Sequence, residues 1–324
     1  MSVVYRVSNL TIRRGRGTEP AIGPLSFEVE AGSAIGIVGE TGAGKTLALR
    51  ALMGLLPTGL RMDGTVQLGE GGMPLVDEMG LRGELGRQIG VVLQNPYTAF
   101  DPLKSVGAQL IEGVVRRHLQ SKWLARERAK VLLVSMGFRD VDDVLRLYPS
   151  QLSGGMAQRI AIAIAMMPEP RVLLADEPTS ALDATLRIGV LQLLRHFTTT
   201  SGAVLVMVSH DLGLVAEFCE QLIVMYGGRA IEMGSASELL EHPRHPYTQA
   251  LIACTPRVGR SGRRRLASIP GSAVSPFANG RGCRYASRCP LVIDICRTEE
   301  PTLTVSGSAS VACHVAQRAS AYRG

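Results

Sequence analysis

Short runs of apolar residues, each closed by glycine, proline or a charged residue, recur along the first 210 positions of the chain. The clearest runs cover residues 33–38, 89–93, 172–175 and 203–208. Because they are almost continuously aliphatic, they predict strands of a parallel sheet that is covered on both faces. Longer helix-compatible stretches lie between them, at residues 45–56, 121–136 and 186–198. This alternation of strands and helices predicts an α/β core.

Three segments depart from the alternation. Residues 97–150 lack a strand-like run, and they predict a helical subdomain inserted into the core. Residues 160–165 alternate as a strand would, but they follow two glycines without a turn, so we expect a helix that starts at those glycines. The composition then changes to proline, glycine, serine and arginine, which predicts a core domain at residues 1–240 and a small irregular extension at 241–324.

Charge separates the same two parts of the chain. The 324 residues carry a net charge of +7, which suggests nucleic-acid binding if it is spread over the whole protein. Residues 242–324, however, hold 12 arginines and only three acidic residues, whereas residues 1–241 hold 23 basic and 25 acidic residues. The positive charge therefore belongs to the extension, and the core is nearly neutral.

The hydropathy of the chain indicates whether any segment could span a membrane. No apolar run approaches the ~20 residues that a membrane-spanning helix needs. The first residues also lack a charged leader followed by an apolar core. We therefore expect a protein that neither spans the membrane itself nor is secreted.

One glycine-rich segment fits the pattern G-x-x-x-x-G-K-[ST] and directly follows a predicted strand. It consists of Gly39, Glu40, Thr41, Gly42, Ala43, Gly44, Lys45 and Thr46. Glycines let consecutive backbone N–H groups turn toward phosphate oxygens, and the next helix directs its positive end at them. We expect Lys45 to bridge the β- and γ-phosphates of a nucleotide and Thr46 to hold Mg²⁺. A plain glycine turn with a solvated lysine is the alternative.

Two adjacent carboxylates, Asp176 and Glu177, follow the apolar run at residues 172–175. Such pairs mostly lie on a solvated surface, but here they close a buried strand downstream of a phosphate loop. We expect Asp176 to join the Mg²⁺ shell and Glu177 to orient or deprotonate an attacking water.

Between these elements stand residues 152–159, with the sequence LSGGMAQR. This segment resembles the signature motif of the ATP-binding subunits of ABC transporters. Gln94 resembles the Q-loop glutamine of that family, Asp183 closes a D-loop-like segment, and His210 resembles the switch histidine. The motifs occur in the order of the family, and the resemblance covers about residues 3–240.

The resemblance implies a P-loop ABC ATPase fold in which two such domains pack head to tail with ATP between them. The residues that would face the nucleotide of the other subunit are Ser153, Gly154, Gly155, Met156, Gln158 and Asp183. In the subunit's own site, Glu177 would be the general base. His210 would contact the γ-phosphate, and Gln94 would join Thr46 and Asp176 at Mg²⁺.

The base end of the site departs from the family pattern. The family usually places an aromatic residue near the N-terminus to stack on adenine, and Arg14 stands there in this chain. A guanidinium plane also stacks on a base, so we expect Arg14 to take part in ATP binding. The alternative is a solvated arginine loop.

The extension narrows the subfamily. Residues 242–251, with the sequence HPRHPYTQAL, resemble a segment of oligopeptide, dipeptide and nickel importer subunits. Four cysteines follow: Cys283, Cys289, Cys296 and Cys313. They resemble the cysteines that can hold a [4Fe–4S] cluster in peptide-importer subunits. Four thiolates also suit Zn²⁺, although the C-x₂-C pairs of most zinc ribbons are missing. An unmetallated or disulfide-linked set is a third possibility.

Together, these features lead us to expect an ATPase subunit that energises peptide import. The resemblance implies a related second ATPase subunit, two membrane permeases and an extracytoplasmic substrate-binding protein. It would place the chain at the cytoplasmic face of the cell membrane, bound peripherally. An importer of nickel or another small solute is one alternative. A soluble ABC ATPase of translation or DNA repair is another, but the chain lacks the second domain or the coiled coils of those classes, so we expect no nucleic-acid partner.

Overall fold

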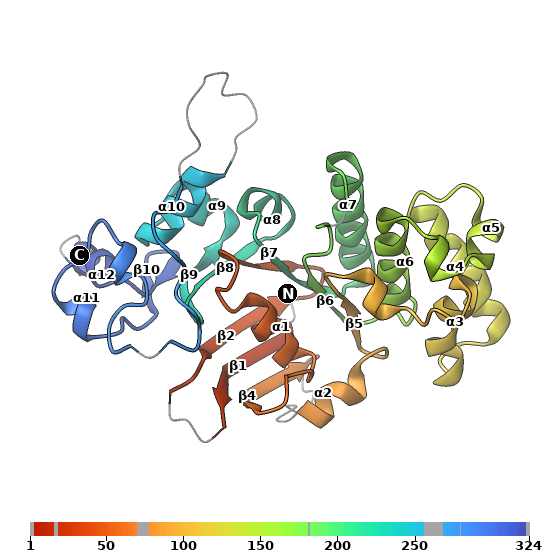
Figure 1. Ribbon diagram of the computed structural model, residues 1–324, viewed down its shortest axis with the longest axis horizontal. Coiled ribbons are helices and arrows are strands. Elements are labelled where there is room, and N and C mark those ends of the chain that lie inside the picture. Colours follow the sequence, from red (N-terminus) through yellow and green to blue (C-terminus); the bar gives the residue numbers. More distant parts are fainter. Residues whose placement is uncertain are drawn as a thin grey trace.

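The fold is built around an eight-stranded sheet, the larger of two sheets in the described residues (Figure 1). The structure is a computed structural model that describes residues 3–15, 19–69, 78–180, 182–255, 268–278 and 280–321. Within these residues, eight strands pair in the order β10-β11-β9-β8-β3-β7-β6-β5. They are β3 (Ala34–Val38), β5 (Ile89–Val92), β6 (Val172–Asp176), β7 (Val204–Ser209), β8 (Gln221–Tyr226), β9 (Arg229–Ser235), β10 (Thr304–Ser306) and β11 (Ala309–Val311).

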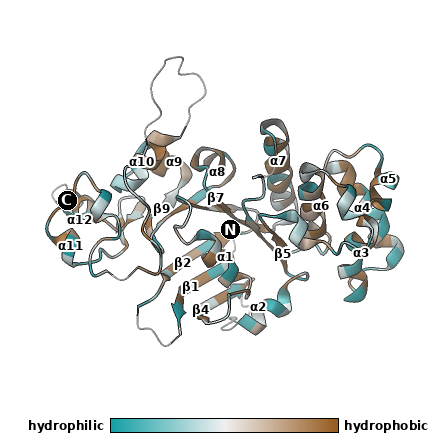
Figure 2. Cartoon of the chain, in the orientation of Figure 1, coloured by the Kyte–Doolittle hydropathy of each residue, from teal (hydrophilic) through white to brown (hydrophobic). Residues whose placement is uncertain are grey.

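Burial of the central strands confirms the sequence-based prediction of a parallel sheet covered on both faces. Strands β5, β6, β7, β3 and β8 pair in parallel, and every residue of β3, β6 and β7 is buried. Alternate residues of β3 belong to two different hydrophobic cores, with Val38 in one and Ile37 in the other. Figure 2 shows the hydrophobic colouring along β5 and β7 that results.

Helices cover the larger sheet. They include α1 (Lys45–Leu52), α6 (Gly154–Met166), α7 (Ala184–Ser201), α8 (Leu212–Phe218) and α9 (Ala236–Glu241). The predicted helix after the two glycines is confirmed as α6. It begins at Gly154, and the Oγ of the preceding Ser153 accepts the Met156 N–H at 3.3 Å and so caps the helix.

The helical subdomain expected at residues 97–150 forms one end of the molecule, opposite the C-terminal extension (Figure 1). Its elements are η1 (Pro96–Ala99), α3 (Val106–Arg116), α4 (Lys122–Ser135), α5 (Val141–Arg146) and η2 (Pro149–Gln151). Ser105 and Ser121 cap α3 and α4 by accepting backbone N–H groups. Apolar residues at helical spacing, such as Leu110, Val114 and Leu133, bury the shared face.

A second, smaller sheet was not foreseen from the sequence. It has the order β2-β1-β4 and is antiparallel. Its strands are β1 (Val3–Arg14), β2 (Ile22–Glu30) and β4 (Leu60–Leu68), and α2 (Glu78–Glu84) lies beside it. Its buried face, with Leu10 and Val66 among others, joins α1 in the second hydrophobic core.

The extension contains more regular structure than the sequence suggested. Its elements are α10 (Pro246–Cys254), η3 (Ala286–Arg288), α11 (Ile295–Thr298), the β10–β11 hairpin and α12 (His314–Ala321). Strand β11 pairs with β9 through Ser310–Met233 and Val311–Glu232, so the hairpin lengthens the core sheet. The boundary expected at residue 240 falls inside α9. None of the helices in the described part of the chain is long and apolar enough to cross a membrane.

Candidate nucleotide-binding site

The carboxyl ends of four neighbouring parallel strands converge at one edge of the larger sheet. Register pairs Val38 with Ser209, Asp176 with Val208, and Val92 with Ala175. Four parts of the predicted site follow these ends: the glycine-rich loop after β3, Gln94 after β5, Glu177 after β6 and His210 after β7. In open α/β sheets, ligands bind at this edge.

The glycine-rich loop passes close to the rest of the core at its two ends. Gly44 has a φ of 103°, and a Cβ there would lie 2.4 Å from Ile22 Cδ1. A Cβ at Gly39 would lie 2.3 Å from the Met225 carbonyl oxygen. Glycine is therefore required at both positions by backbone conformation or by space. Between them, Thr41 and Gly42 are exposed and Ala43 is buried.

Lys45 is folded back over the loop that precedes it. Its Nζ donates to the carbonyl oxygens of Gly39 at 2.8 Å and of Glu40 at 3.0 Å. Burial lowers the pKa of Lys45, while the nearby Glu177, Asp176 and Glu40 carboxylates act in the opposite direction. The result is an ammonium group held where phosphates would meet the loop.

Thr46 and Asp176 bring two oxygen donors together from different elements. The Thr46 hydroxyl donates to Asp176 Oδ1 at 3.1 Å. Asp176 is buried at the end of β6, and this burial raises the pKa of its carboxyl. A hydroxyl and a carboxylate so placed suit Mg²⁺, which prefers oxygen ligands.

Glu177 is held between the two other predicted residues. Gln94 Nε2 donates to Glu177 Oε2 at 3.1 Å, and His210 Nδ1 lies 2.9 Å from Glu177 Oε1. The Glu177 side chain is only 15% exposed, whereas that of His210 is 60% exposed. The structure therefore brings Gln94, Glu177 and His210 into one contact group.

The backbone of Glu177 has an unusual conformation that aims this side chain. Its φ is 45°, in the left-handed region that non-glycine residues rarely adopt. Its N–H donates to the Val208 carbonyl at 2.9 Å, and its carbonyl accepts from the Ser180 N–H and hydroxyl, both at 3.1 Å. Left-handed residues held by their surroundings in this way are frequent at functional sites.

A cavity of about 1200 Å³ joins most of these groups. Its lining includes Thr41, Gly42 and Gly44 of the loop and the first turn of α1, together with Gln94, Glu177 and His210. Arg14, at the end of β1, also lines it, as do residues 273–277 of the extension. The cavity is large enough for a nucleoside triphosphate.

Comparison with known proteins decides the family. The sequence profile described as "ABC transporter" matches residues 22–180, and the profile described as "Oligopeptide/dipeptide transporter, C-terminal region" matches residues 231–296. The dipeptide transport ATP-binding protein DppD of Escherichia coli is 37% identical over 305 residues, which are 93% of each chain. The oligopeptide transport ATP-binding protein AppD of Bacillus subtilis is 35% identical, over 94% of this chain and 93% of its own. The chain belongs to the ABC transporter family.

Solved ABC ATPases share its fold. The ATP-binding cassette MJ0796, in a dimeric post-hydrolysis state bound to ADP and Pi, superposes with a TM-score of 0.62 at 26% identity, covering 72% of this chain and 98% of its own. CbiO1 of Clostridium perfringens, part of the ABC transporter complex cbiONQ, gives a TM-score of 0.63 at 25% identity, covering 75% and 92%. The expected P-loop ABC ATPase fold is confirmed.

The predicted signature motif of this ABC ATPase lies at the N-terminus of α6, and none of its residues is among the described residues that line the cavity. Ser153 is exposed, and Gly154, Gly155 and Met156 are partly exposed. Gln158 is different: its side chain is completely buried and both of its polar atoms lack a hydrogen-bond partner. The expectation that Gln158 faces a nucleotide is therefore corrected, because its side chain is buried beneath α6.

Asp183, the predicted D-loop residue of the ABC ATPase, directly precedes α7. Its Oδ1 accepts the Leu186 N–H at 3.0 Å, which caps the helix. A Cβ on Gly155 would touch Leu182 and Leu186, so the predicted signature motif and the predicted D-loop lie side by side.

The contacts that join the extension to the phosphate loop were not predicted from the sequence. Arg288 forms a two-pronged ion pair with Glu40, at 2.7 and 3.1 Å, and its own side chain is only 3% exposed. These hydrogen bonds raise the pKa of Arg288. Tyr247, from the HPRHPYTQAL segment, accepts the Glu40 N–H at 2.8 Å. No spacing in the sequence could have signalled these pairs, because Glu40 and Arg288 are 248 positions apart.

The four clustered cysteines lie in one region, but they do not form a ready metal site. All six cysteines are free. Burial raises the pKa of Cys283 to about 11, and the Cys296, Cys313 and Cys289 thiols add to this. Within the described ranges, no group of three or more histidine, cysteine, aspartate or glutamate residues is placed to hold a metal ion. The expected [4Fe–4S] cluster is therefore not confirmed.

The HPRHPYTQAL segment of the ABC ATPase depends on a neutral histidine. His245 is 1% exposed, and its Nδ1 accepts the Tyr247 N–H at 3.0 Å, which caps α10. The backbone N–H of His245 donates to Oε2 of the buried Glu232 at 3.1 Å. Burial lowers the pKa of His245 to about 3.

This shift predicts a specific loss of stability in acid. The folded-state pKa is depressed, so the contribution of His245 is complete above the unfolded pKa of about 6.5 and is lost as the pH falls toward 3. Replacing His245→Asn keeps a side-chain acceptor but removes the titration. Urea unfolding of both proteins between pH 7 and pH 4.5 should show a steeper fall for the parent, by up to about 1.4 kcal/mol per pH unit.

The matched control is His242→Asn, because His242 is exposed in the same segment. It should follow the parent at every pH. Parallel pH profiles for the parent and His245→Asn would contradict the buried neutral state of His245.

Proposed function

We propose that this chain is the ATP-hydrolysing subunit that energises peptide import in an ABC transporter. The observation that carries the proposal is the match of residues 231–296 to the oligopeptide/dipeptide transporter C-terminal profile, beside a complete set of hydrolytic side chains. The names of its E. coli and B. subtilis relatives point to the same substrate class. Hydrolysis of ATP then drives the transport cycle.

The site supports hydrolysis by positioning. The loop N–H groups and Lys45 would bind the phosphates, and Glu177 would accept a proton from the attacking water. Gln94 and His210 fix the two carboxylate oxygens of Glu177, and exposed His210 can also reach the γ-phosphate. Thr46, Asp176 and Gln94 would hold Mg²⁺, which neutralises phosphate charge. No other general base is needed at this edge of the sheet.

A second ATPase subunit would complete each nucleotide site. Ser153, Gly154, Gly155 and Met156 form a partly exposed helix N-terminus, which favours an anion such as a γ-phosphate. Their separation from the chain's own cavity supports action on the nucleotide of a partner subunit. Asp183 lies beside them and would join the same interface.

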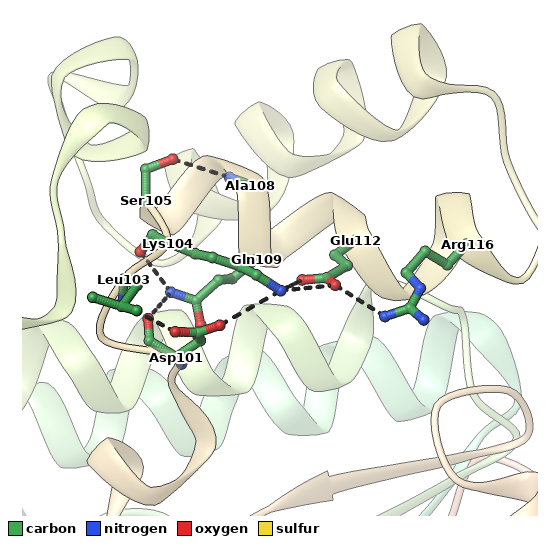
Figure 3. A network of polar contacts seen from close by, with 8 residues as sticks. All are labelled: Asp101, Leu103, Lys104, Ser105, Ala108, Gln109, Glu112 and Arg116. Carbon is green, nitrogen blue, oxygen red and sulfur yellow. Dashed lines mark hydrogen bonds and ion pairs between the residues drawn. The ribbon is translucent and has the colours of Figure 1, made fainter.

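A network of polar contacts lies at the start of the helical subdomain, around the first turns of α3 (Figure 3). Gln109 accepts the Asp101 N–H at 2.9 Å and donates to the Asp101 and Lys104 carbonyls. Lys104 pairs with Glu112 at 2.7 Å, and Glu112 also pairs with Arg116. This network fixes a loop whose Leu103 side chain is 86% exposed.

Beside the loop lies a cavity of about 610 Å³, lined among others by Gln109, Glu112 and Ile164. An apolar side chain displayed on a rigid loop next to a cavity suits an apolar segment of a membrane subunit. Gln94 is only seven positions before Asp101, so docking here can reach the hydrolytic site. Two permeases and an extracytoplasmic substrate-binding protein would complete the complex, and the chain would lie peripherally at the cytoplasmic face of the membrane.

We also propose that Cys283, Cys289, Cys296 and Cys313 bind a thiolate-ligated metal centre, with [4Fe–4S] preferred and Zn²⁺ as the alternative. Backbone N–H groups of Tyr285 and Leu291 point at the sulfurs of Cys283 and Cys289 and favour their thiolate forms. Burial favours the thiols, so metal loading must release protons.

Metal analysis of anaerobically purified protein tests this proposal. Iron and acid-labile sulfide near four atoms each per chain are expected, with loss in Cys296→Ser and retention in Cys254→Ser, a cysteine outside the set. Zinc without iron selects the alternative centre. Metal-free protein that binds neither iron nor zinc on reconstitution refutes the centre.

Hydrolysis depends on one carboxylate. Glu177→Gln keeps the shape of the side chain but cannot accept a proton, so we expect kcat for ATP to fall by about 10²–10⁴ while ATP binding is retained. The control Glu217→Gln changes an exposed glutamate on α8 and should leave kcat unchanged. Hydrolysis by Glu177→Gln at the parent rate would show that Glu177 is not the base.

The substrate class is tested in vesicles that contain the chain with its permeases and binding protein. Peptides should stimulate ATP hydrolysis and accumulate inside, and Glu177→Gln should abolish both. Stimulation by nickel or another small solute, with none by peptides, would overturn the assignment to peptide import.

If Leu103 contacts a permease, its substitution should weaken permease binding without changing ATP hydrolysis by the isolated chain. Leu103→Asp places a charge at the displayed side chain and should reduce co-purification with the permeases by about 10-fold or more. ATP hydrolysis by the isolated chain should stay at the parent level. Met79→Asp is the control, because Met79 is 81% exposed on α2. Equal permease binding by the parent and Leu103→Asp would place the contact elsewhere.

A further inference from the structure

The cavity that holds the phosphate-loop residues has a wall that comes from the C-terminal extension. Residues Ala273, Val274, Ser275, Pro276 and Phe277 all line it, together with Arg14 and Lys45. The core residues of the cavity already account for the phosphates and the attacking water. The wall formed by residues 273–277 has no role in that chemistry.

The wall is firmly attached to the core. Arg288, while paired with Glu40, donates through Nη2 to the Ile269 carbonyl at 3.2 Å and through Nε to the Pro270 carbonyl at 2.6 Å. At the other end, Arg284 donates to the Ala278 carbonyl. In between, Pro276 lies 3.4 Å from a Cβ built on Gly44, directly over the start of α1.

Phe277 is the aromatic side chain of this wall. The Ser275 hydroxyl accepts its N–H at 3.2 Å, and the Arg14 guanidinium lies over its ring at 4.2 Å from the centroid. Phe277 is 37% exposed, and Arg14 is exposed as well. A guanidinium stacked on an aromatic ring on one side can stack on a planar base with its other side.

We propose that Phe277 and Arg14 form the platform that binds the purine base of the nucleotide. Phe277 holds the Arg14 guanidinium flat, and the base stacks on this pair while the phosphates occupy the loop. The extension therefore supplies part of the ATP site of its own subunit, which gives residues 273–277 a role in nucleotide affinity. This inference rests on the proposed function, since it assumes that the cavity binds ATP.

The test compares a ligand that has a base with one that has none. Binding of ATP and of inorganic tripolyphosphate, each with Mg²⁺, is measured by calorimetry on the full chain carrying Glu177→Gln to prevent hydrolysis. Adding Phe277→Ala should weaken ATP binding by about 5- to 150-fold, the range expected for loss of one base-stacking contact. Tripolyphosphate binding should not change, and it also reports that the phosphate loop is intact.

Two further variants sharpen the result. Phe277→Tyr keeps the ring and should bind ATP like the parent. Leu303→Ala removes an apolar side chain of the extension with matched exposure, 38%, and should change neither ligand. Equal weakening of ATP and tripolyphosphate by Phe277→Ala, or unchanged ATP binding, would overturn the platform. A parent chain that binds neither ligand would refute the proposed function, and the inference with it.

Discussion

Parallel pairing of β3, β7, β6 and β5 is the constraint on which the site depends. Because these strands run the same way, the residues that follow them must emerge at one edge, although they come from positions as distant as Gly39 and His210. Complete burial of the strands fixes their register, since a shift by one residue would turn apolar side chains out of one core and into the other. The contacts of Glu177 with Gln94 and His210 follow from that register.

The extension acts on the same edge from outside the core. Arg288 and Tyr247 both bind Glu40, one through its carboxylate and one through its backbone N–H. A buried guanidinium with a two-pronged carboxylate partner is oriented as well as neutralised. The phosphate loop is therefore held on one side by the sheet and on the other by the extension. Because Arg288 directly precedes Cys289, any change at the cysteine set lies one residue from this contact.

Much of the core could be predicted from sequence because its signals are local. Aliphatic runs marked β3, β5, β6 and β7, and the LSGGMAQR segment marked the start of α6. The smaller sheet was missed although residues 25–30 alternate cleanly in β2. In β1, register shifts and the left-handed Asn9 break the alternation that would have revealed its partner.

Contacts between distant segments could not be predicted. The ion pair of Glu40 with Arg288 and the contact of Arg14 with Phe277 join residues more than 240 positions apart, and neither leaves a periodic pattern. The burial of Gln158 could not be predicted either, because a sequence motif specifies the residue type but not the direction of its side chain on α6. The spacing of the four cysteines indicated that they lie near one another. It could not indicate how their sulfur atoms are arranged, and among the described residues they are not placed to hold a metal ion.

The most direct measurement is an experimental structure of the Glu177→Gln chain with Mg²⁺ and ATP. We predict phosphates on residues 39–46, Mg²⁺ against the side-chain oxygens of Thr46, Asp176 and Gln94, and the base stacked at Arg14 and Phe277. A triphosphate bound away from the glycine-rich loop, or Mg²⁺ held by residues other than Thr46, Asp176 and Gln94, would contradict this prediction.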